Sequence, residues 1–337
     1  MKAMVLDELN SKLVYRDYPD PTIDSPTDVI IRVKACGVCA TDLKVISGHI
    51  DSEGLPRIVG HEPAGEVIAV GSAVRNVKIG DNVISATYQS CKQCEYCRSA
   101  RDTLCGNVQG RLGITVDGGF AEQMKLQAAC LVKIPDGVDV AKACVLPCGA
   151  GVSYHALVKR IQLSPADKVI VLGAGGLGIQ AVQMATLCGA EAVAVDLDDE
   201  KLALAKKNGA SYVVNTKAPD YMEQLQGIKD ATVLFDSTAI SKLVADCMSV
   251  LKKGARVVFA GYGPHKTLEI PFETIALNEF ELYGSRGVGM KDVEDLIVLL
   301  KNGKINPAVT KYPLCELNDI LEKMKNNTLV GRAVMIP

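Results

Sequence analysis

Four closely spaced cysteines are the clearest chemical feature of the sequence. Cys91, Cys94, Cys97 and Cys105 follow the spacing C-x2-C-x2-C-x7-C. Four thiolates this close together can surround one Zn²⁺ tetrahedrally and leave no open position, which is typical of a structural site. An iron–sulfur cluster is the main alternative, but the fourth spacing differs from the bacterial ferredoxin run and no proline follows Cys105. Free thiols or disulfides are the remaining alternatives, and we expect a structural-zinc lobe over about residues 88–110.

A glycine-rich turn follows a short apolar run in the second half of the chain. The strand-like segment Lys168–Leu172 leads into the sequence G-A-G-G-L-G at 173–178. In a G-x-G-x-x-G turn the first glycine permits the tight turn, the second lets a pyrophosphate approach the backbone, and the third allows helix and strand to pack closely. The following helix would direct its free N–H groups at that pyrophosphate. The candidate cofactor-binding residues of the turn are Gly173, Gly175, Gly176, Leu177 and Gly178.

An acidic residue after the next expected strand indicates which dinucleotide binds. Asp196 lies 23 residues beyond Gly173 and follows the strand expected at 192–195. A carboxylate at this position accepts hydrogen bonds from the adenosine ribose hydroxyls and repels a 2′-phosphate. Asp198 and Asp199 add negative charge, and the sequence places no arginine nearby to pair with a phosphate. The pattern favours NAD over NADP. The alternative to a dinucleotide site is a glycine turn that serves only to pack the helix against the strand.

The elements that must position these residues fall into two groups. Short apolar or alternating runs at 29–33, 65–70 and 82–84 predict a β-rich region up to about residue 150. From Lys168 onward, apolar strands alternate with amphipathic helices, which predicts a parallel sheet covered on both faces. We expect strands at Lys168–Leu172, 192–195, Tyr212–Asn215, 232–235 and 256–260, and helices at 177–188, 199–208, 241–252 and 291–301. The rest is expected to be a polar tail that ends in a strand at 333–336.

Length, charge and cysteine content exclude several classes of protein. A chain of 337 residues suggests about two domains. Lys plus Arg is 37 and Asp plus Glu is 39, and no long basic stretch is present, so neither nucleic acid nor a membrane is expected as a partner. The apolar run 169–190 is better explained by a strand, a glycine turn and a buried helix than by a membrane span. Twelve cysteines are too few for a disulfide scaffold, and the first residues contain no signal-peptide core, so we expect a cytoplasmic protein.

Three further potential metal ligands lie far apart in the sequence, each within a short motif. Cys39 lies in G-x-C-x-T-D, His61 in G-H-E-x-x-G and Cys148 in L-P-C-G; taken singly, each is ordinary. In this order, beside the four-cysteine lobe and the glycine turn, the set resembles the zinc-containing medium-chain alcohol dehydrogenase family. The sequences G-G-F-A-E at 118–122, Y-H-A-L at 154–157 and G-R-A-V at 331–334 are also similar to that family. The resemblance covers essentially the whole chain.

The resemblance implies an α/β protein with two kinds of domain. A β-rich GroES-like catalytic domain would comprise residues 1–149 and a C-terminal return at 288–337, and a Rossmann domain with a doubly wound parallel sheet would comprise 150–287. The implied cofactors are NAD and two Zn²⁺ per chain, one catalytic and one structural. By resemblance, the strand at 280–284 extends the sheet across a subunit interface, which implies a homodimer or homotetramer.

The resemblance also implies a set of ligands for the catalytic zinc. Cys39, His61 and Cys148 would bind the ion and leave a fourth position for water or substrate. Related polyol dehydrogenases use a glutamate as the third ligand, whereas Cys148 follows the alcohol dehydrogenases. Cys144, one helical turn before Cys148, is the alternative third ligand.

Supporting residues are implied in the same way. Glu62 matches a carboxylate that can transiently bind the metal, and Asp42 matches the partner that orients the ligating histidine. Thr41 matches the hydroxyl that accepts the proton of the metal-bound alcohol, and Lys201 matches a lysine near the adenosine ribose. Lys44 stands where many members have a relay histidine. Either its pKa is lowered, or protons leave through water, or it contacts a polar substrate group, or it has no role.

The expected activity is the oxidation of a primary or secondary alcohol or a polyol to an aldehyde or ketone, with hydride passing from a zinc-bound alkoxide to NAD. The expected partner is therefore a small alcohol or carbonyl substrate. One alternative is a quinone or alkene reductase on the same scaffold, but that class usually lacks the zinc ligands. The other is a non-catalytic structural protein that retains the fold, against which the retention of every ligand argues.

Overall fold

The chain divides into two compact units in the computed structural model, which describes residues 1–50, 54–263, 265–329 and 331–337. The first unit comprises Met1–Gly151 and Gly287–Pro337, and the second comprises Val152–Arg286. The predicted boundaries lay after residues 149 and 287. Each unit contains a hydrophobic core of its own. Within the described ranges, we find no helix that combines the length and the apolarity needed to cross a bilayer.

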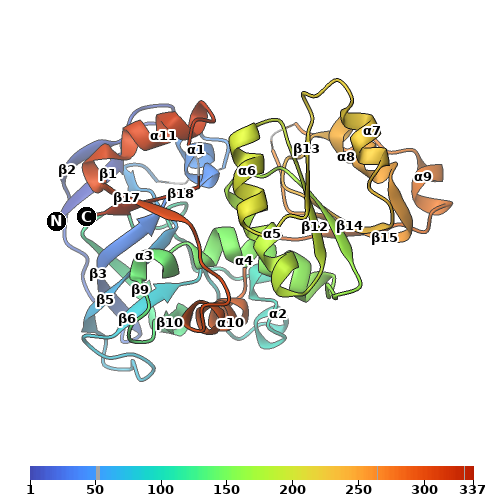
Figure 1. The fold of residues 1–337 in the computed structure, drawn as a ribbon. Coiled ribbons are helices and arrows are strands. Elements are labelled where there is room, and N and C mark those ends of the chain that lie inside the picture. The colour runs from blue at the N-terminus through green and yellow to red at the C-terminus, as the bar shows by residue number, and fades with distance from the viewer. Residues whose placement is uncertain (51–53, 264, 330) are drawn as a thin grey trace. The chain divides into compact units, whose positions relative to one another are not determined.

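The first unit is built on largely antiparallel sheets (Figure 1). Its main sheet runs in the order β10 (Leu131–Lys133), β6 (Asn82–Ser85), β5 (Glu62–Val70), β3 (Asp28–Gly37), β18 (Arg332–Ile336) and β17 (Val309–Pro313), and β9 (Gln123–Gln127) also pairs with β3. A second sheet contains β2 (Val14–Asp17), β1 (Lys2–Leu6) and β4 (Arg57–Ile58), and a third contains β7 (Tyr88–Gln89) and β8 (Gly110–Arg111). The C-terminal strand β18 thus lies beside the N-terminal strand β3, which gives the unit two separate stretches of chain.

Short helical segments connect these strands and carry several of the candidate site residues. They are α1 (Ala40–Ile46), α2 (Glu95–Arg98), the 3₁₀ turns η1 (Asp102–Leu104) and η2 (Ala128–Cys130), α3 (Val140–Ala143) and the π-helical turn η3 (Leu146–Ala150). The C-terminal return adds α10 (Met290–Lys301), the 3₁₀ turn η5 (Leu314–Glu316) and α11 (Leu317–Lys325).

The residues after 301 hold more regular structure than a polar tail. β17 and α11 both form there, so that expectation was wrong. Leu317, Ile320 and Leu321 are buried on one face of α11, which matches the spacing of an amphipathic helix. Their burial in the core of the first unit stabilises a helix whose remaining residues are mostly polar.

The second unit contains a six-stranded sheet in which every pairing is parallel. Its order is β13 (Tyr212–Asn215), β12 (Glu191–Asp196), β11 (Lys168–Leu172), β14 (Ala231–Asp236), β15 (Leu251–Phe259) and β16 (Glu281–Gly284), the order of a doubly wound dinucleotide-binding sheet. The helices are α5 (Gly176–Leu187), α6 (Asp199–Lys207), α7 (Tyr221–Gln226), α8 (Ser241–Met248) and α9 (Phe272–Ala276); α4 (Gly151–Tyr154) and the π-helical η4 (His155–Arg160) precede the sheet. The predicted fold class is confirmed.

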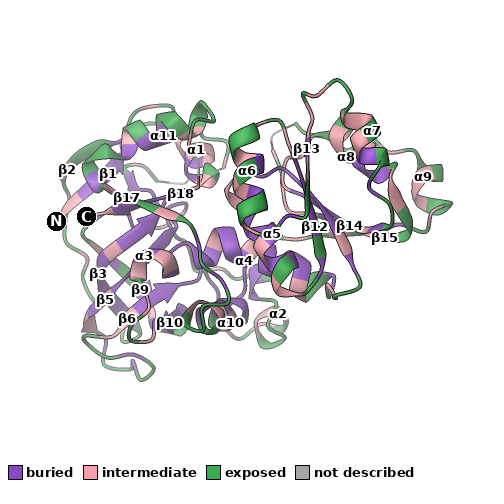
Figure 2. Ribbon diagram, in the orientation of Figure 1, coloured by how far each residue is buried: buried purple, intermediate pink, exposed green. Residues whose placement is uncertain are grey.

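One predicted helix in this unit was too long. We expected a helix over 241–252, but α8 ends at Met248 and Leu251 already pairs with Ala231 in the sheet. Leu251 and Lys252, the last residues of the predicted helix, therefore belong to strand β15. The central strands are buried on both faces, as Figure 2 shows, and residues 169–172 of β11 are at most 1% exposed. This burial explains the continuous apolar sequence of β11.

Candidate metal centres and cofactor loop

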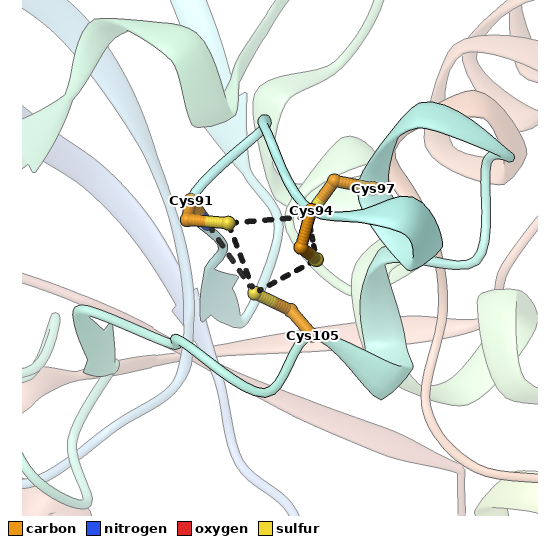
Figure 3. Close-up of side chains that lie close together, drawn as sticks. All are labelled: Cys91, Cys94, Cys97 and Cys105. Carbon is orange, nitrogen blue, oxygen red and sulfur yellow. Dashed lines mark hydrogen bonds between the residues drawn. The ribbon is translucent and has the colours of Figure 1, made fainter.

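The four cysteines of the predicted lobe converge on one point (Figure 3). Their Sγ–Sγ distances are 3.5 Å for Cys91–Cys105 and for Cys94–Cys97, 3.8 Å for Cys94–Cys105 and 3.9 Å for Cys91–Cys97. Sulfurs bound tetrahedrally to one Zn²⁺ lie about 3.8 Å apart, whereas a disulfide joins them at about 2 Å. In an iron–sulfur cube each cysteine binds a different iron atom, so its sulfurs would be farther apart. The geometry therefore fits a single tetrahedral ion.

Backbone N–H groups around the lobe favour thiolates. Cys105 Sγ accepts hydrogen bonds from the backbone N–H groups of Cys91 at 3.5 Å and of Asn107 at 3.4 Å. The backbone N–H groups of Gln93 and Cys94 lower the pKa of Cys91 to about 6. Because a metal binds thiolate rather than thiol, these N–H groups prepare the lobe for an ion.

Three residues far apart in the sequence form a second cluster in the first unit. Cys39 directly precedes α1, His61 directly precedes β5, and Cys148 lies in the π-helical turn η3. Cys39 Sγ and Cys148 Sγ are 3.5 Å apart. One ligand atom from each of these residues and from Glu62 lies within 4.8 Å of the others. Two sulfurs, one nitrogen and a nearby carboxylate match the donor set of a catalytic zinc site.

Asp42 organises this cluster from the first turn of α1. Its Oδ2 accepts a hydrogen bond from the backbone N–H of Cys39 at 2.9 Å, and its Oδ1 lies 3.0 Å from His61 Nδ1. If Nδ1 donates its proton to Asp42, Nε2 keeps the lone pair that a metal requires. His61 Nε2 is buried and has no hydrogen-bond partner among the described residues. A buried nitrogen left without a partner fits a position that a metal ion fills.

The two thiols of the cluster shift each other's pKa in opposite directions. The contact with Cys148 lowers the pKa of Cys39 well below its usual range, and the contact with Cys39 raises the pKa of Cys148. Burial would lower the pKa of His61, but Asp42 outweighs burial and raises it. Binding of a divalent ion would therefore displace protons from this cluster.

Glu62 is fully buried beside the cluster and forms an ion pair that the sequence analysis missed. Nη2 of Arg332, in β18, donates to both carboxylate oxygens of Glu62. Burial raises the pKa of Glu62, and the Arg332 charge opposes that shift. In the sequence, Arg332 stands out only as part of the G-R-A-V motif at 331–334. The available signal was a charged residue within the otherwise apolar run 332–336.

Thr41 and Lys44 occupy neighbouring turns of α1. Thr41 Oγ1 lies 3.8 Å from Cys39 Sγ. Lys44 is half-buried, and this burial lowers the pKa of its ammonium group, while the charges of Cys39 and Cys148 oppose the shift. Cys144, the alternative third ligand, points elsewhere: it is fully buried, and its Sγ contacts the carbonyl of Ala141 at 3.2 Å.

The glycine turn of the second unit has the geometry that each glycine was expected to provide. Gly173 has φ +91°, a conformation that favours glycine. A Cβ at Gly178 would lie only 1.7 Å from the carbonyl oxygen of Gly173, so helix α5 and the turn pack without room for a side chain. A Cβ at Gly175, the residue before α5, would meet nothing within 4 Å. The backbone is thus open at the position where a pyrophosphate would approach.

Asp196 lies beside the glycine turn at the end of β12. Its Oδ2 accepts from the backbone N–H of Ala174 at 2.7 Å, and its Oδ1 accepts from Leu197 at 2.7 Å and Asp198 at 3.1 Å. Each carboxylate oxygen has two lone pairs, so Oδ2 retains capacity for a ribose hydroxyl. Lys201 is half-buried in the first turn of α6, the helix that follows β12.

Comparisons with known proteins agree on one family. A model described as the alcohol dehydrogenase GroES-like domain matches residues 25–136, and one described as zinc-binding dehydrogenase matches 176–302. The chain is 37% identical over 341 residues to an alcohol dehydrogenase of Geobacillus stearothermophilus, spanning 99% of each. The chain belongs to the zinc-containing medium-chain alcohol dehydrogenase family.

Solved structures of this family share the fold over the full chain. The alcohol dehydrogenase of the archaeon Aeropyrum pernix is 30% identical with a TM-score of 0.92, and the match covers 100% of both chains. The acetophenone reductase of Geotrichum candidum, solved in complex with NAD, is 27% identical with a TM-score of 0.88, and the match covers 100% of this chain and 97% of the other. This chain therefore combines the fold of the zinc-binding dehydrogenases with a four-cysteine site.

Proposed function

We propose that the chain is a zinc- and NAD-dependent dehydrogenase that oxidises a primary or secondary alcohol or a polyol to an aldehyde or ketone. The observation that carries this proposal is the convergence of Cys39, His61 and Cys148, whose ligand atoms lie within 4.8 Å of one another. The substrate partner would be a small alcohol or carbonyl compound. Because thiolate ligands must stay reduced, the cytoplasm is the compartment that suits the protein.

In this proposal each chain holds two zinc ions. Cys91, Cys94, Cys97 and Cys105 would hold the structural ion, and Cys39, His61 and Cys148 the catalytic ion, with the carboxylate of Glu62 close by. When bound, zinc supplies a Lewis acid that lowers the pKa of the substrate alcohol, and NAD supplies the hydride acceptor. Asp42 fixes the orientation of His61; both residues and Glu62 are buried, whereas Cys39 and Cys148 are half-buried.

Proton removal would use the hydroxyl of Thr41 and the amine of Lys44, one turn apart on α1. A lysine accepts a proton only in its neutral form, and burial lowers the pKa of Lys44. Activity should therefore rise with pH through that lowered pKa. Lys44→Ala should lower kcat and remove this part of the pH–rate profile. An unchanged profile with unchanged KM values would show that Lys44 has no direct role.

NAD is the proposed dinucleotide because of the charge beside the glycine turn. Asp196 is held there by three backbone N–H groups and keeps acceptor capacity for ribose hydroxyls. Lys201 on the next helix would lie near the same ribose. Binding of NAD to the related acetophenone reductase supports this choice.

We also propose that the protein is a homodimer or homotetramer. β16 is one of the two edge strands of the six-stranded sheet, and its Leu282 is 41% exposed. Phe272 on α9 is 90% exposed and Leu277, which follows that helix, is 73% exposed in the same unit. An open strand edge with nearby apolar side chains suits pairing with a second copy. Leu282→Lys should shift the sedimentation coefficient towards the monomer; an unaltered assembly would place the interface elsewhere.

A substrate panel with NAD and NADP side by side tests the proposed activity. Primary alcohols, secondary alcohols and polyols are assayed by NADH absorbance. Quinones and activated alkenes are included as substrates of the alternative class of enzyme, the reductases. We expect NADH formation with at least one alcohol and a preference for NAD over NADP. We expect His61→Ala to abolish NADH formation. Turnover of quinones or alkenes alone would favour a reductase, and no turnover of any substrate would favour a non-catalytic protein.

A further inference from the structure

Asp102 is a buried carboxylate inside the four-cysteine lobe, and it is not one of the four residues whose ligand atoms converge there. It begins the 3₁₀ turn η1 between Cys97 and Cys105 and is 5% exposed. Its own carbonyl accepts a hydrogen bond from the backbone N–H of Cys105 at 3.1 Å. The position of Asp102 is therefore tied directly to a residue that holds the structural ion.

The side chain of Asp102 bridges the lobe, where Oδ2 accepts from Ser90 Oγ at 3.5 Å, and the C-terminal return of the same unit. Both carboxylate oxygens lie 3.3 Å from the backbone N–H of Met290, the first residue of α10. Oδ2 also accepts from Lys92 Nζ at 3.2 Å. A Cβ at Gly289 would lie 2.7 Å from Asp102 Oδ1, so the carboxylate rests directly on the backbone there. A buried carboxylate at a helix amino end is stabilised by the free N–H group and the helix dipole.

The amino end of α10 in turn contacts the segment that carries Cys148. A Cβ at Gly151 would lie 2.6 Å from Val288 Cγ2, so the Val288 side chain packs against the backbone that ends η3. α10 itself also packs against η3. Cys148 lies within this π-helical turn, where backbone hydrogen bonding is less regular than in an α-helix. The position of Cys148 Sγ therefore depends on the support that α10 gives to η3.

We propose that Asp102 is a positioning residue that couples the four-cysteine site to the Cys39–His61–Cys148 site through the amino end of α10. The inference rests on the proposed function, because it assumes an ion at each site. An ion in the lobe fixes Cys105 and η1, and Asp102 then holds Met290 and Val288 against η3. When the carboxylate is lost, Asp292 Oδ2 still accepts from the backbone N–H of Gly289, but the N–H of Met290 loses its side-chain acceptor. The amino end of α10 then supports η3 less firmly, and Cys148 is held less firmly for its ion. Coupling between two sites of this kind typically changes an affinity by about tenfold.

Cobalt exchange into the purified zinc protein tests this coupling without an activity assay. A site with an open position exchanges more readily than a closed four-cysteine site, and Co²⁺ bound by thiolates gives visible absorption bands. We expect Asp102→Ala to weaken Co²⁺ binding at the Cys39 site about tenfold, as measured by chelator competition, and to shift those bands. Glu294→Gln is the matched control on the exposed face of α10 and should match the wild type.

Gly289→Ala provides a second perturbation if Asp102→Ala does not fold. It leaves the charge of Asp102 in place but adds a methyl group that must displace the carboxylate. The same loss of cobalt affinity is expected. Wild-type cobalt affinity and spectra in both variants would overturn the coupling while leaving the proposed function intact. A wild-type protein with no thiolate–cobalt bands would overturn the proposed function and the coupling with it.

Discussion

Arg332 is the charge that compensates the fully buried carboxylate of Glu62, and its removal has a predictable consequence. Arg332 is 8% exposed and Glu62 0%, so Arg332→Met leaves a buried carboxylate without its guanidinium partner, while its other basic neighbour, His61 Nε2, lies 3.7 Å from Oε1. Breaking a buried pair from one side typically costs about 3–5 kcal/mol. For a unit of this size, each kcal/mol lowers the melting temperature by about 2–4 °C. We therefore expect the transition of the first unit to fall by about 6–20 °C.

Calorimetry of the purified protein checks this expectation, with two companion variants. Glu62→Gln combined with Arg332→Met removes the buried charge and should recover most of the lost stability. Arg16→Met is the control: Arg16 pairs with Asp7, both side chains are more than 40% exposed, and the cost should stay below about 1 kcal/mol. If Arg332→Met costs no more than Arg16→Met, or if the double variant is less stable than the single one, the account of this pair is wrong.

Two further predictions concern the second unit. Gly178→Ala places a methyl carbon 1.7 Å from the carbonyl oxygen of Gly173, so it should lower the free energy of unfolding by about 3 kcal/mol or more in thermal denaturation. Gly175→Ala should fold normally and weaken NAD binding about tenfold or more in titration calorimetry. Equal stability of the two variants would contradict this prediction. Burial acts to raise the pKa of Asp167, but the ion pair with Arg256 acts against burial, and the pKa is lowered overall. The stability that this pair contributes is therefore fully present above the ordinary aspartate pKa, and it is lost as the pH falls through the lowered pKa. Asp167→Asn should flatten the acid-induced loss of stability below about pH 4, and an unchanged acid transition would count against the pair.

Much of the second unit could be predicted from the sequence because its rules are local, but the short helices α7 and α9 were not predicted, and β15 begins five residues before the expected strand 256–260. The strand Lys168–Leu172 has the predicted bounds, and α5 begins within the glycine turn as its geometry requires. The end of α8 could not be placed, because the pairing of Leu251 with Ala231 is a tertiary effect. The helix α11 carried a readable signal in Leu317, Ile320 and Leu321 that the prediction of a polar tail overlooked.

The candidate sites differ in how far the sequence alone predicts them. The four-cysteine lobe follows from spacing, because neighbouring thiolates can reach one ion without help from the fold. Cys39 and Cys148 are 109 residues apart, so only the family resemblance suggested that they meet. Arg332 and Glu62 are 270 residues apart and meet because β18 pairs with β3 beside β5. Neither spacing nor periodicity specifies that contact.

In the proposed enzyme, Cys39, His61 and Cys148 share one ion in addition to the ion of the four-cysteine lobe. Metal analysis of the wild type, Cys148→Ser and Cys144→Ser tests it most directly, because both thiols are in the same segment but only Cys148 belongs to the cluster. We expect two zinc ions per chain in the wild type and in Cys144→Ser, and about one in Cys148→Ser. A wild type with a single ion, or a Cys148→Ser variant that keeps both, would contradict it.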